Sequence, residues 1–184
     1  MGFRYDIRLS GSGGQGIILM GIILAEAIGI HDGRYVAQTQ SYGPEARGGS
    51  SKAEVVVSDS EIDYPKATNP DLQVILTQKA CEEYVHDTKR GGTVILDDFY
   101  VFERPSVDAE IFMLPIVRTA KEKLGKEMVT NMVALGATAR ILELAEVVQP
   151  ESVKKAILAR VPKGTEKLNE QAFEEGYAMM KEKK

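Results

Sequence analysis

Six residues near the N-terminus read GSGGQG, a spacing that can bring backbone amides close to a phosphate. Glycine permits tight turns and places no Cβ between the backbone and a ligand. The alternating stretch Arg4 to Leu9 before them predicts a strand, and the apolar stretch Ile17 to Gly29 after them predicts a helix. Free N–H groups at a helix start favour anions. We therefore expect one of two roles, anion binding or a tight turn packed on neighbouring backbone, for Gly11, Ser12, Gly13, Gly14, Gln15 and Gly16.

The surroundings of this glycine loop argue against two common nucleotide sites. A dinucleotide site needs an acidic residue about 20 residues further on, at the end of the second strand, to hold the ribose. The stretch Tyr35 to Gln40 (YVAQTQ) contains no carboxylate, which counts against NAD. No Gly-Lys-Ser/Thr follows the loop, so it is not an ATP P-loop. A free-standing Rossmann-like protein that binds NAD(P) or another phosphate ligand stays open as an alternative. We also expect Gly13→Val to damage the loop, because β-branched residues tolerate positive φ poorly.

A second glycine-rich stretch, Gln40 to Ser50 (QSYGPEARGGS), is the most distinctive of the chain. Its arginine is followed by two glycines and can approach a phosphate or carboxylate closely and bind it through two hydrogen bonds. The alternative is that Arg47 pairs with Glu45 or another acidic residue and fixes the loop. The candidate binding residues here are Tyr42, Arg47, Gly48 and Gly49.

Strand-like and helix-like segments alternate along the chain. Further strands are expected at Tyr35–Thr39, Ala53–Ser58, Asp71–Thr77, Thr93–Leu96 and Ile111–Leu114. Helices are expected at Lys79–Lys89, around Met128–Leu142, from Pro150 to Arg160 and from Thr165 to about Lys181. This order predicts an α/β fold: one domain, residues 1–184, with three layers, a mostly parallel sheet flanked by helices, and a helical C-terminal part. No crossover helix fits before the Ala53 strand, which leaves an antiparallel orientation open for it.

Other residues able to do chemistry have simpler explanations. Cys81 could have a lowered pKa at a helix start, but an inert small residue is favoured. Asp97 and Asp98 follow a buried strand and could hold a ribose or magnesium, but a turn or cap role is favoured. Met128, Met132, Leu135, Ala139 and Leu142 step by 4, 3, 4 and 3, which predicts one buried helix face.

Composition excludes several classes of protein. One cysteine and two histidines in 184 residues cannot build an iron–sulfur cluster or a Cys- or His-rich metal site within this chain. A net charge of −4 is unsuited to wrapping nucleic acid. The most apolar stretch, Ile17 to Ile30, falls short of the about 20 residues that a membrane span needs. We expect a cytoplasmic protein that binds neither nucleic acid nor membrane.

Two loops together carry a family resemblance. GSGGQG at Gly11–Gly16 is followed at this distance by QSYGPEARGG at Gln40–Gly49, and then by Asp71–Leu76 before a polar helix and by NMVALG at Asn131–Gly136. In this order, over essentially the whole chain, the sequence resembles the gamma subunit of 2-oxoacid:ferredoxin oxidoreductases, which act on pyruvate, 2-oxoglutarate or ketoisovalerate.

The resemblance implies a non-redox subunit of a larger enzyme. Such enzymes convert a 2-oxoacid, coenzyme A and oxidised ferredoxin to acyl-CoA, CO2 and reduced ferredoxin. Thiamine diphosphate, magnesium and the iron–sulfur clusters would lie on alpha, beta and ferredoxin-like partner subunits, with none of them bound by this chain alone. The isolated chain is expected to be inactive, and a homodimer is a further option. The two glycine-rich loops would shape the coenzyme A approach or a subunit interface. The substrate is expected to be 2-oxoglutarate or pyruvate.

Overall fold

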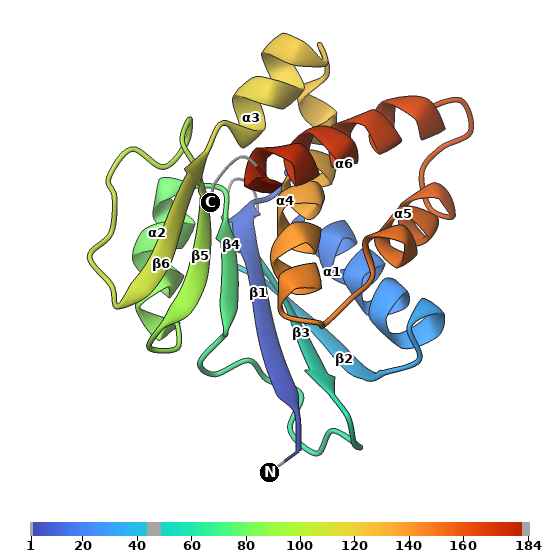
Figure 1. Cartoon of the computed structure of the whole chain (residues 1–184). Helices are drawn as coiled ribbons and strands as arrows, with labels where there is room; N and C mark the ends of the chain where they lie inside the picture. The colour runs from blue at the N-terminus through green and yellow to red at the C-terminus, as the bar shows by residue number, and fades with distance from the viewer. Residues whose placement is uncertain (1, 44–48, 182–184) are drawn as a thin grey trace.

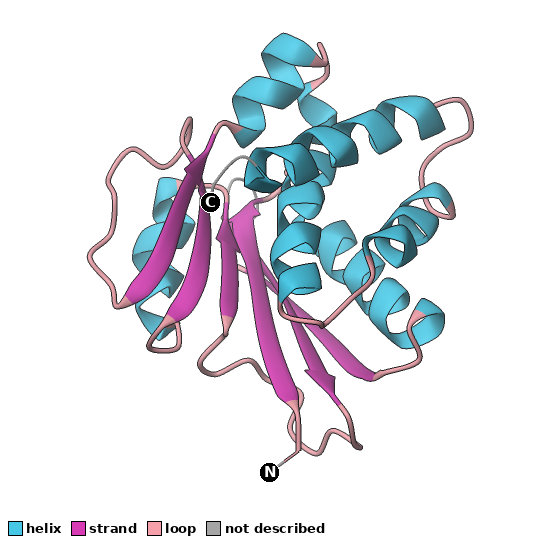
Figure 2. Cartoon of the chain, in the orientation of Figure 1, coloured by secondary structure: helices cyan, strands magenta, loops and turns pink. Residues whose placement is uncertain are grey.

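The computed structural model describes residues 2–43 and 49–181, and within this part six strands form one twisted sheet (Figures 1 and 2). The strands are β1 Arg4–Ser12, β2 Tyr35–Tyr42, β3 Ser50–Ser58, β4 Leu72–Ile75, β5 Gly92–Asp97 and β6 Ala109–Leu114. Their order is β2-β3-β1-β4-β5-β6. Only β3 runs against the others, because β1 and β2 both pair with it in antiparallel register. The antiparallel orientation that the sequence allowed for the strand at Ala53 is therefore observed in β3.

Helices cover both faces of the sheet, which confirms the predicted three-layer α/β class (Figure 1). The helices are α1 Ile17–Glu26, α2 Gln78–Tyr84, α3 Ile116–Arg118, α4 Thr130–Leu144, α5 Pro150–Leu158 and α6 Glu166–Lys181. One face carries α1 and the C-terminal helices α4, α5 and α6, and α2 lies on the other. In the part of the chain that the structure describes, no helix is both long and apolar enough to cross a bilayer.

The hydrophobic core lies mainly between the sheet and the C-terminal helices. Ile7 and Leu9 of β1 and Val55 of β3 are fully buried against α1 and α4. A smaller cluster under α2 includes Ile75 of β4 and Val94 of β5. The central parallel strands thus have apolar residues on both faces, which explains their continuous apolar sequences.

Helices α4 and α6 approach each other at backbone contact. A Cβ on Gly136 would lie 1.9 Å from the carbonyl oxygen of Phe173, and one on Gly176 would lie 1.8 Å from that of Val133. Only hydrogen fits at either position, so the two glycines set the packing of α6 on the core.

The predicted apolar helix face is correct except at its first residue. Met132, Leu135, Ala139 and Leu142 are buried in α4, but Met128 is 81% exposed. The helix begins at Thr130, and Met128 belongs to a preceding 3-10 turn, Glu127–Val129. The change of helical pitch turns this side chain away from the face that its spacing predicted.

Candidate functional site

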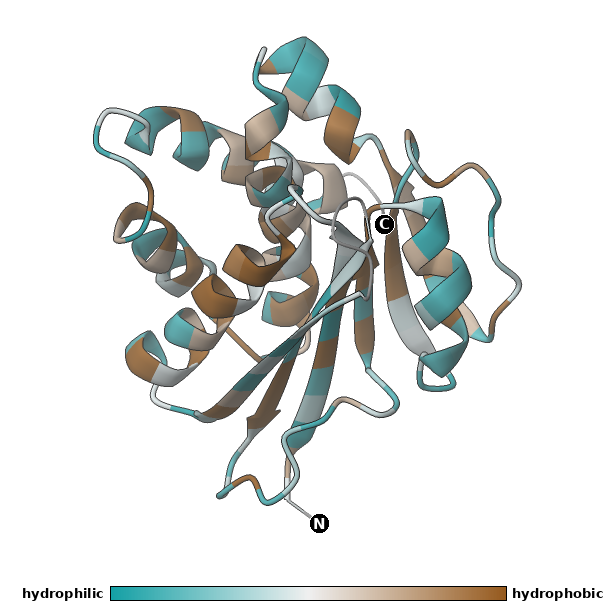
Figure 3. Cartoon of the chain, turned by 180° about the vertical axis from the view of Figure 1, so that it is seen from behind, coloured by the Kyte–Doolittle hydropathy of each residue, from teal (hydrophilic) through white to brown (hydrophobic). Residues whose placement is uncertain are grey.

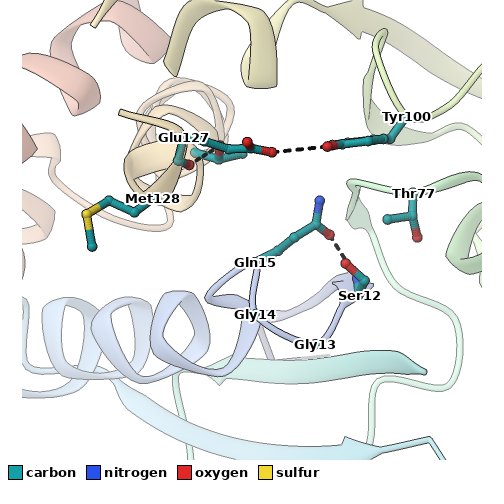
Figure 4. Close-up of a pocket in the computed structure, with 9 residues that line it drawn as sticks. Ser12, Gly13, Gly14, Gln15, Thr77, Tyr100, Glu127 and Met128 are labelled. Carbon is teal, nitrogen blue, oxygen red and sulfur yellow. Dashed lines mark hydrogen bonds between the residues drawn. The ribbon is translucent and has the colours of Figure 1, made fainter. Parts of the chain in front are cut away.

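A cavity of about 490 Å³ opens at the carboxyl edge of the sheet, beside the end of β1 (Figure 4). Part of its wall comes from the residues at and just after the ends of β1, β4 and β5, where parallel strands commonly present binding residues. Another part comes from the segment that leads into α4. The lining residues are Ser12, Gly13, Gly14, Gln15, Thr77, Tyr100, Glu127, Met128 and Thr130.

Gln15 closes the base of this cavity rather than projecting freely into it. Its Oε1 accepts a hydrogen bond from the backbone N–H of Ser12 at 2.8 Å (Figure 4). Its Nε2 donates to the carbonyl of Leu76 at 3.4 Å. A Cβ on Gly11 would lie 2.4 Å from Gln15 Oε1. Gly11 therefore leaves room for the folded-back Gln15 side chain, which joins the ends of β1 and β4.

Gly16 has a conformational role at the start of α1. Its φ is 75°, in the left-handed region that favours glycine. The amide of Asn131 packs directly against it. For this residue the packed-turn reading fits the structure better than direct ligand contact.

Gly13 and Gly14 form an open floor of bare backbone. A Cβ at either position would have no neighbour within 4 Å. Gly14 has φ 89°, whereas Gly13 is not among the glycines with positive φ. The expectation that Gly13→Val strains the backbone assumed a positive φ at Gly13, and this assumption was wrong. A side chain at Gly13 also has unoccupied space around it.

The structure brings the two glycine-rich loops into contact. The N–H of Gly13 donates to the carbonyl of Gly49 at 3.2 Å. Tyr42, the last residue of β2, is 70% exposed and is not among the described residues that line the cavity. Arg47 and Gly48 lie outside the described residues. A cavity contact is thus observed for Ser12, Gly13, Gly14 and Gln15, while the binding roles of all ten candidates stay predictions.

A hydrogen-bonded pair crosses the far side of the cavity. The Tyr100 hydroxyl donates to Glu127 Oε1 at 3.0 Å, and Lys121 Nζ lies 3.4 Å from the other carboxylate oxygen (Figure 4). Burial and the nearby Glu127 carboxylate raise the pKa of Tyr100. The phenol therefore stays protonated and can hold this hydrogen bond at neutral pH.

Asp97 holds the backbone of Tyr100 in place through hydrogen bonds. Its side chain is fully buried and accepts hydrogen bonds from the N–H groups of Phe99, Tyr100 and Val117 at 3.1, 2.8 and 2.9 Å. Burial raises the pKa of this carboxyl, while the three N–H groups act in the opposite direction. The favoured turn role of Asp97 is confirmed.

The described lining of the cavity is mainly polar. Among these residues Glu127 is the one carboxylate, and none is lysine or arginine. Among the described residues, no group of three or more His, Cys, Asp or Glu side chains could hold a metal ion. Cys81 is buried under the sheet, and burial raises its thiol pKa to about 11, so the inert reading holds. The arrangement can bind and orient a ligand through hydroxyls and backbone.

Sequence reasoning missed five of the lining residues: Thr77, Tyr100, Glu127, Met128 and Thr130. Thr77 and Tyr100 follow the ends of two buried strands, and the carboxyl-edge rule could have found them. Glu127 and its neighbours carry no such local signal, because only the packing of α4 brings them to the cavity.

The whole chain matches known proteins. The family model "Pyruvate ferredoxin/flavodoxin oxidoreductase" matches residues 6–179. The chain belongs to this family. The 2-oxoglutarate synthase subunit KorC of Methanocaldococcus jannaschii is 50% identical over 181 residues, covering 97% of this chain and 95% of that protein. The resemblance drawn from the two loops is thereby confirmed.

Solved structures of the pyruvate ferredoxin/flavodoxin oxidoreductase family share the fold. The gamma subunit of a keto/oxoacid ferredoxin oxidoreductase from Geobacter sulfurreducens is 44% identical, with a TM-score of 0.85 over 97% of this chain and 99% of that one. A 2-oxoglutarate:ferredoxin oxidoreductase from Magnetococcus marinus, 24% identical, has the same fold over 98% of this chain and 32% of its own, with a TM-score of 0.86.

Strand order separates this family member from dinucleotide-binding proteins. In the Rossmann fold the strand that carries the ribose-binding carboxylate lies beside the first strand. Here the antiparallel β3 occupies that place, and β2 is displaced to the sheet edge. The NAD(P) alternative therefore lacks the required strand order as well as the carboxylate.

Proposed function

We propose that this chain is the gamma subunit of a 2-oxoglutarate:ferredoxin oxidoreductase. The reaction converts 2-oxoglutarate, coenzyme A and oxidised ferredoxin to succinyl-CoA, CO2 and reduced ferredoxin. The observation that carries the proposal is the 50% identity, over nearly all of both chains, to a 2-oxoglutarate synthase subunit. Pyruvate is the rival substrate.

The redox and thiamine chemistry is assigned to partner subunits. The lone thiol of this chain is buried, and its described residues offer no metal-holding cluster, so the donor set does not fit an iron–sulfur centre. We propose alpha and beta subunits and a ferredoxin-like subunit as the carriers of thiamine diphosphate, magnesium and the clusters. This chain then contributes binding and positioning, and by itself is inactive.

We further propose that the cavity beside Gly13 receives the uncharged, amide-bearing arm of coenzyme A. The backbone of Gly14, the Gly13 carbonyl and the hydroxyls of Ser12, Thr77 and Tyr100 supply both donors and acceptors. The absence of a cation among the described lining residues favours this arm over the phosphates, which would be held elsewhere. A segment of a partner subunit is the competing occupant.

Gly13 offers a direct test, because a side chain there has room to enter the cavity. In the assembled complex, Gly13→Ala and Gly13→Val should raise the KM for coenzyme A progressively, with the KM for 2-oxoglutarate unchanged. Ser60→Val, on an exposed loop, is the control. Unchanged coenzyme A kinetics in both glycine variants would reject the coenzyme A role, and failure of the variants to join the complex would favour a subunit contact.

The substrate and subunit assignment is tested separately. The complex purified through this chain should reduce viologen with coenzyme A and 2-oxoglutarate, and more slowly with pyruvate. Faster turnover of pyruvate would overturn the substrate assignment. Full activity reassembled from the other subunits alone would overturn the subunit assignment.

A further inference from the structure

Strand β2 leaves one edge of the sheet open. It is the outermost strand, and in the described part of the chain its sheet partner is β3. Free edges are usually protected by charge, proline or a bulge. The eight residues YVAQTQSY contain no charge and no proline, and the pairing with β3 runs without a bulge from Tyr35 to Tyr42. The opposite edge strand, β6, is shorter and carries Glu110.

One hydrogen bond determines which backbone groups of β2 face outward. The N–H of Gly43, the residue after β2, donates to the carbonyl of Ser50 at 2.7 Å. In an antiparallel pair, residues alternate between those bonded to the partner strand and those directed away. Because Gly43 bonds to β3, the even-numbered residues Val36, Gln38, Gln40 and Tyr42 direct their N–H and C=O groups to the open edge. Four evenly spaced donor–acceptor pairs are therefore available to another strand.

Apolar residues of helix α1 are a second indication that another chain covers this side of the molecule. It is apolar around almost its whole circumference, a property of buried helices. Its Ile18, Ile22 and Ala25 are nevertheless only half-buried. The helix packs over this side of the sheet, since a Cβ on Gly21 would contact Ala53 of β3 and the Gln38 side chain of β2. In Figure 3, which colours the ribbon by hydropathy, the ribbon of α1 is mostly brown, the colour of hydrophobic residues.

We propose that the β2 edge pairs with β2 of a second copy of this chain, forming a continuous sheet through a two-fold axis at Thr39. In this register each Thr39 faces the other, Gln38 faces Gln40 of the second copy, and Val36 faces Tyr42 of the second copy. All four outward-facing residues of each copy then form hydrogen-bonded pairs, because the two-fold axis repeats both the Gln38–Gln40 pair and the Val36–Tyr42 pair. A register centred on Gln38 would leave Tyr42 opposite Arg34, outside the strand.

A second copy fits because the strand is complementary to itself. Like charges directly opposite each other destabilise a pair, and this strand has none to oppose. Aromatic residues pair favourably with β-branched residues, as Tyr42 does with Val36, and two threonines can hydrogen-bond. The pairing would also cover Tyr42, which is 70% exposed in the single chain. The pairing does not depend on the coenzyme A role of the cavity.

Cysteine cross-linking tests this register. Opposed residues in a non-hydrogen-bonded antiparallel pair have Cα atoms about 4.5 Å apart, within disulfide range. Under mild oxidation the full chain with Thr39→Cys should form a covalent dimer, both alone and in the complex. Ser41→Cys is the matched control, since the two cysteines would lie about 14 Å apart. Native Cys81 is buried and does not compete. Equal cross-linking of the two variants, or none with Thr39→Cys, would overturn the register.

Charge exchange tests the identity of the partner. Thr39→Lys and Thr39→Glu should each sediment as monomers where the wild type sediments as a dimer, and a mixture of the two, differently tagged, should co-purify. Ser41→Lys should stay dimeric. Circular dichroism of each variant checks folding. A wild-type monomer, or a mixture that does not co-purify, would overturn the proposal. Loss of a different subunit from the Thr39→Lys complex would assign the edge to that subunit instead.

Discussion

Asn131 stands directly over Gly16, 115 residues earlier in the chain: a Cβ on Gly16 would lie 2.3 Å from Asn131 Nδ2. Gly16 begins α1, and Asn131 lies in the first turn of α4 with 5% exposure. The contact therefore locks the two helix starts together beside the cavity. Gly16 and Asn131 lie in two of the stretches that carried the family resemblance. Their contact explains physically why these two stretches occur together.

Gly16→Ala should destabilise the chain by about 2 kcal/mol or more. Alanine would be held at positive φ, at a cost of about 1 kcal/mol, and its methyl would displace Asn131. Gly13→Ala is the matched control and should change stability by less than about 1 kcal/mol, because its Cβ has open space. Urea unfolding of the two variants measures the difference. Equal stabilities would show that the Asn131 contact yields without cost.

A buried ion pair on the α2 side of the sheet should be sensitive to loss of one partner. Arg8 and Glu54, each 4% exposed, lie 3.1 Å apart across β1 and β3. Arg8→Met should cost about 3 kcal/mol, because Glu54 would stay buried with one described ion-pair partner, Lys52, and Asp87 would lose its pair with Arg8.

Two further variants complete this test. Arg8→Met with Glu54→Leu should recover part of the loss, since no unpaired charge is left buried. Arg90→Met removes the exposed pair with Asp108 and should cost less than about 1 kcal/mol. Unfolding of the Arg8 and Arg90 variants at the same urea concentration would contradict the larger cost expected for the buried pair.

Stability should fall at alkaline pH. Burial raises the pKa of the Cys81 thiol from 9.0 to about 11, and burial raises the pKa of Tyr5 and of Tyr84 to about 12. Above pH 9 the unfolded chain releases the thiol proton while the folded chain retains it, so rising pH favours unfolding. Below pH 9 both states keep the proton and this group has no effect.

Cys81→Ala isolates the thiol contribution. Between pH 9 and 11 the unfolding free energy of this variant should fall less steeply than that of the wild type, with the tyrosines adding to both above pH 10. Parallel pH profiles would contradict the raised thiol pKa. In the folded chain the thiol should also react with a disulfide reagent much more slowly than in urea.

The end of α4 offers a stabilising substitution. Glu146 has φ 57°, the one non-glycine residue with positive φ among those described. Its backbone carbonyl accepts a hydrogen bond from Arg34 at 2.7 Å, which glycine would preserve. Glu146→Gly should therefore raise the unfolding free energy by up to about 1 kcal/mol, as glycine favours this position after a helix. Glu151→Gly, inside α5, should lower it. A destabilised Glu146→Gly chain would show that the side chain has another role.

The sequence alone determined the fold class and the family. Alternation in β1, the apolar run of α1 and the glycines between them are local signals, so they predicted the order strand, turn and helix, although β1 continues through Gly11 and Ser12. The two glycine-rich loops were distinctive enough to indicate the gamma-subunit family.

Only the tertiary structure decided how the cavity is built. Gly11 and Gly16 are explained by Gln15 and Asn131, whose side chains fill the space that a Cβ would need. Tyr100 and Glu127 meet across the cavity although neither belongs to a recognisable motif. Local periodicity encodes which face of an element is apolar. It does not encode which distant element packs on that face, because that depends on long-range packing of the whole core.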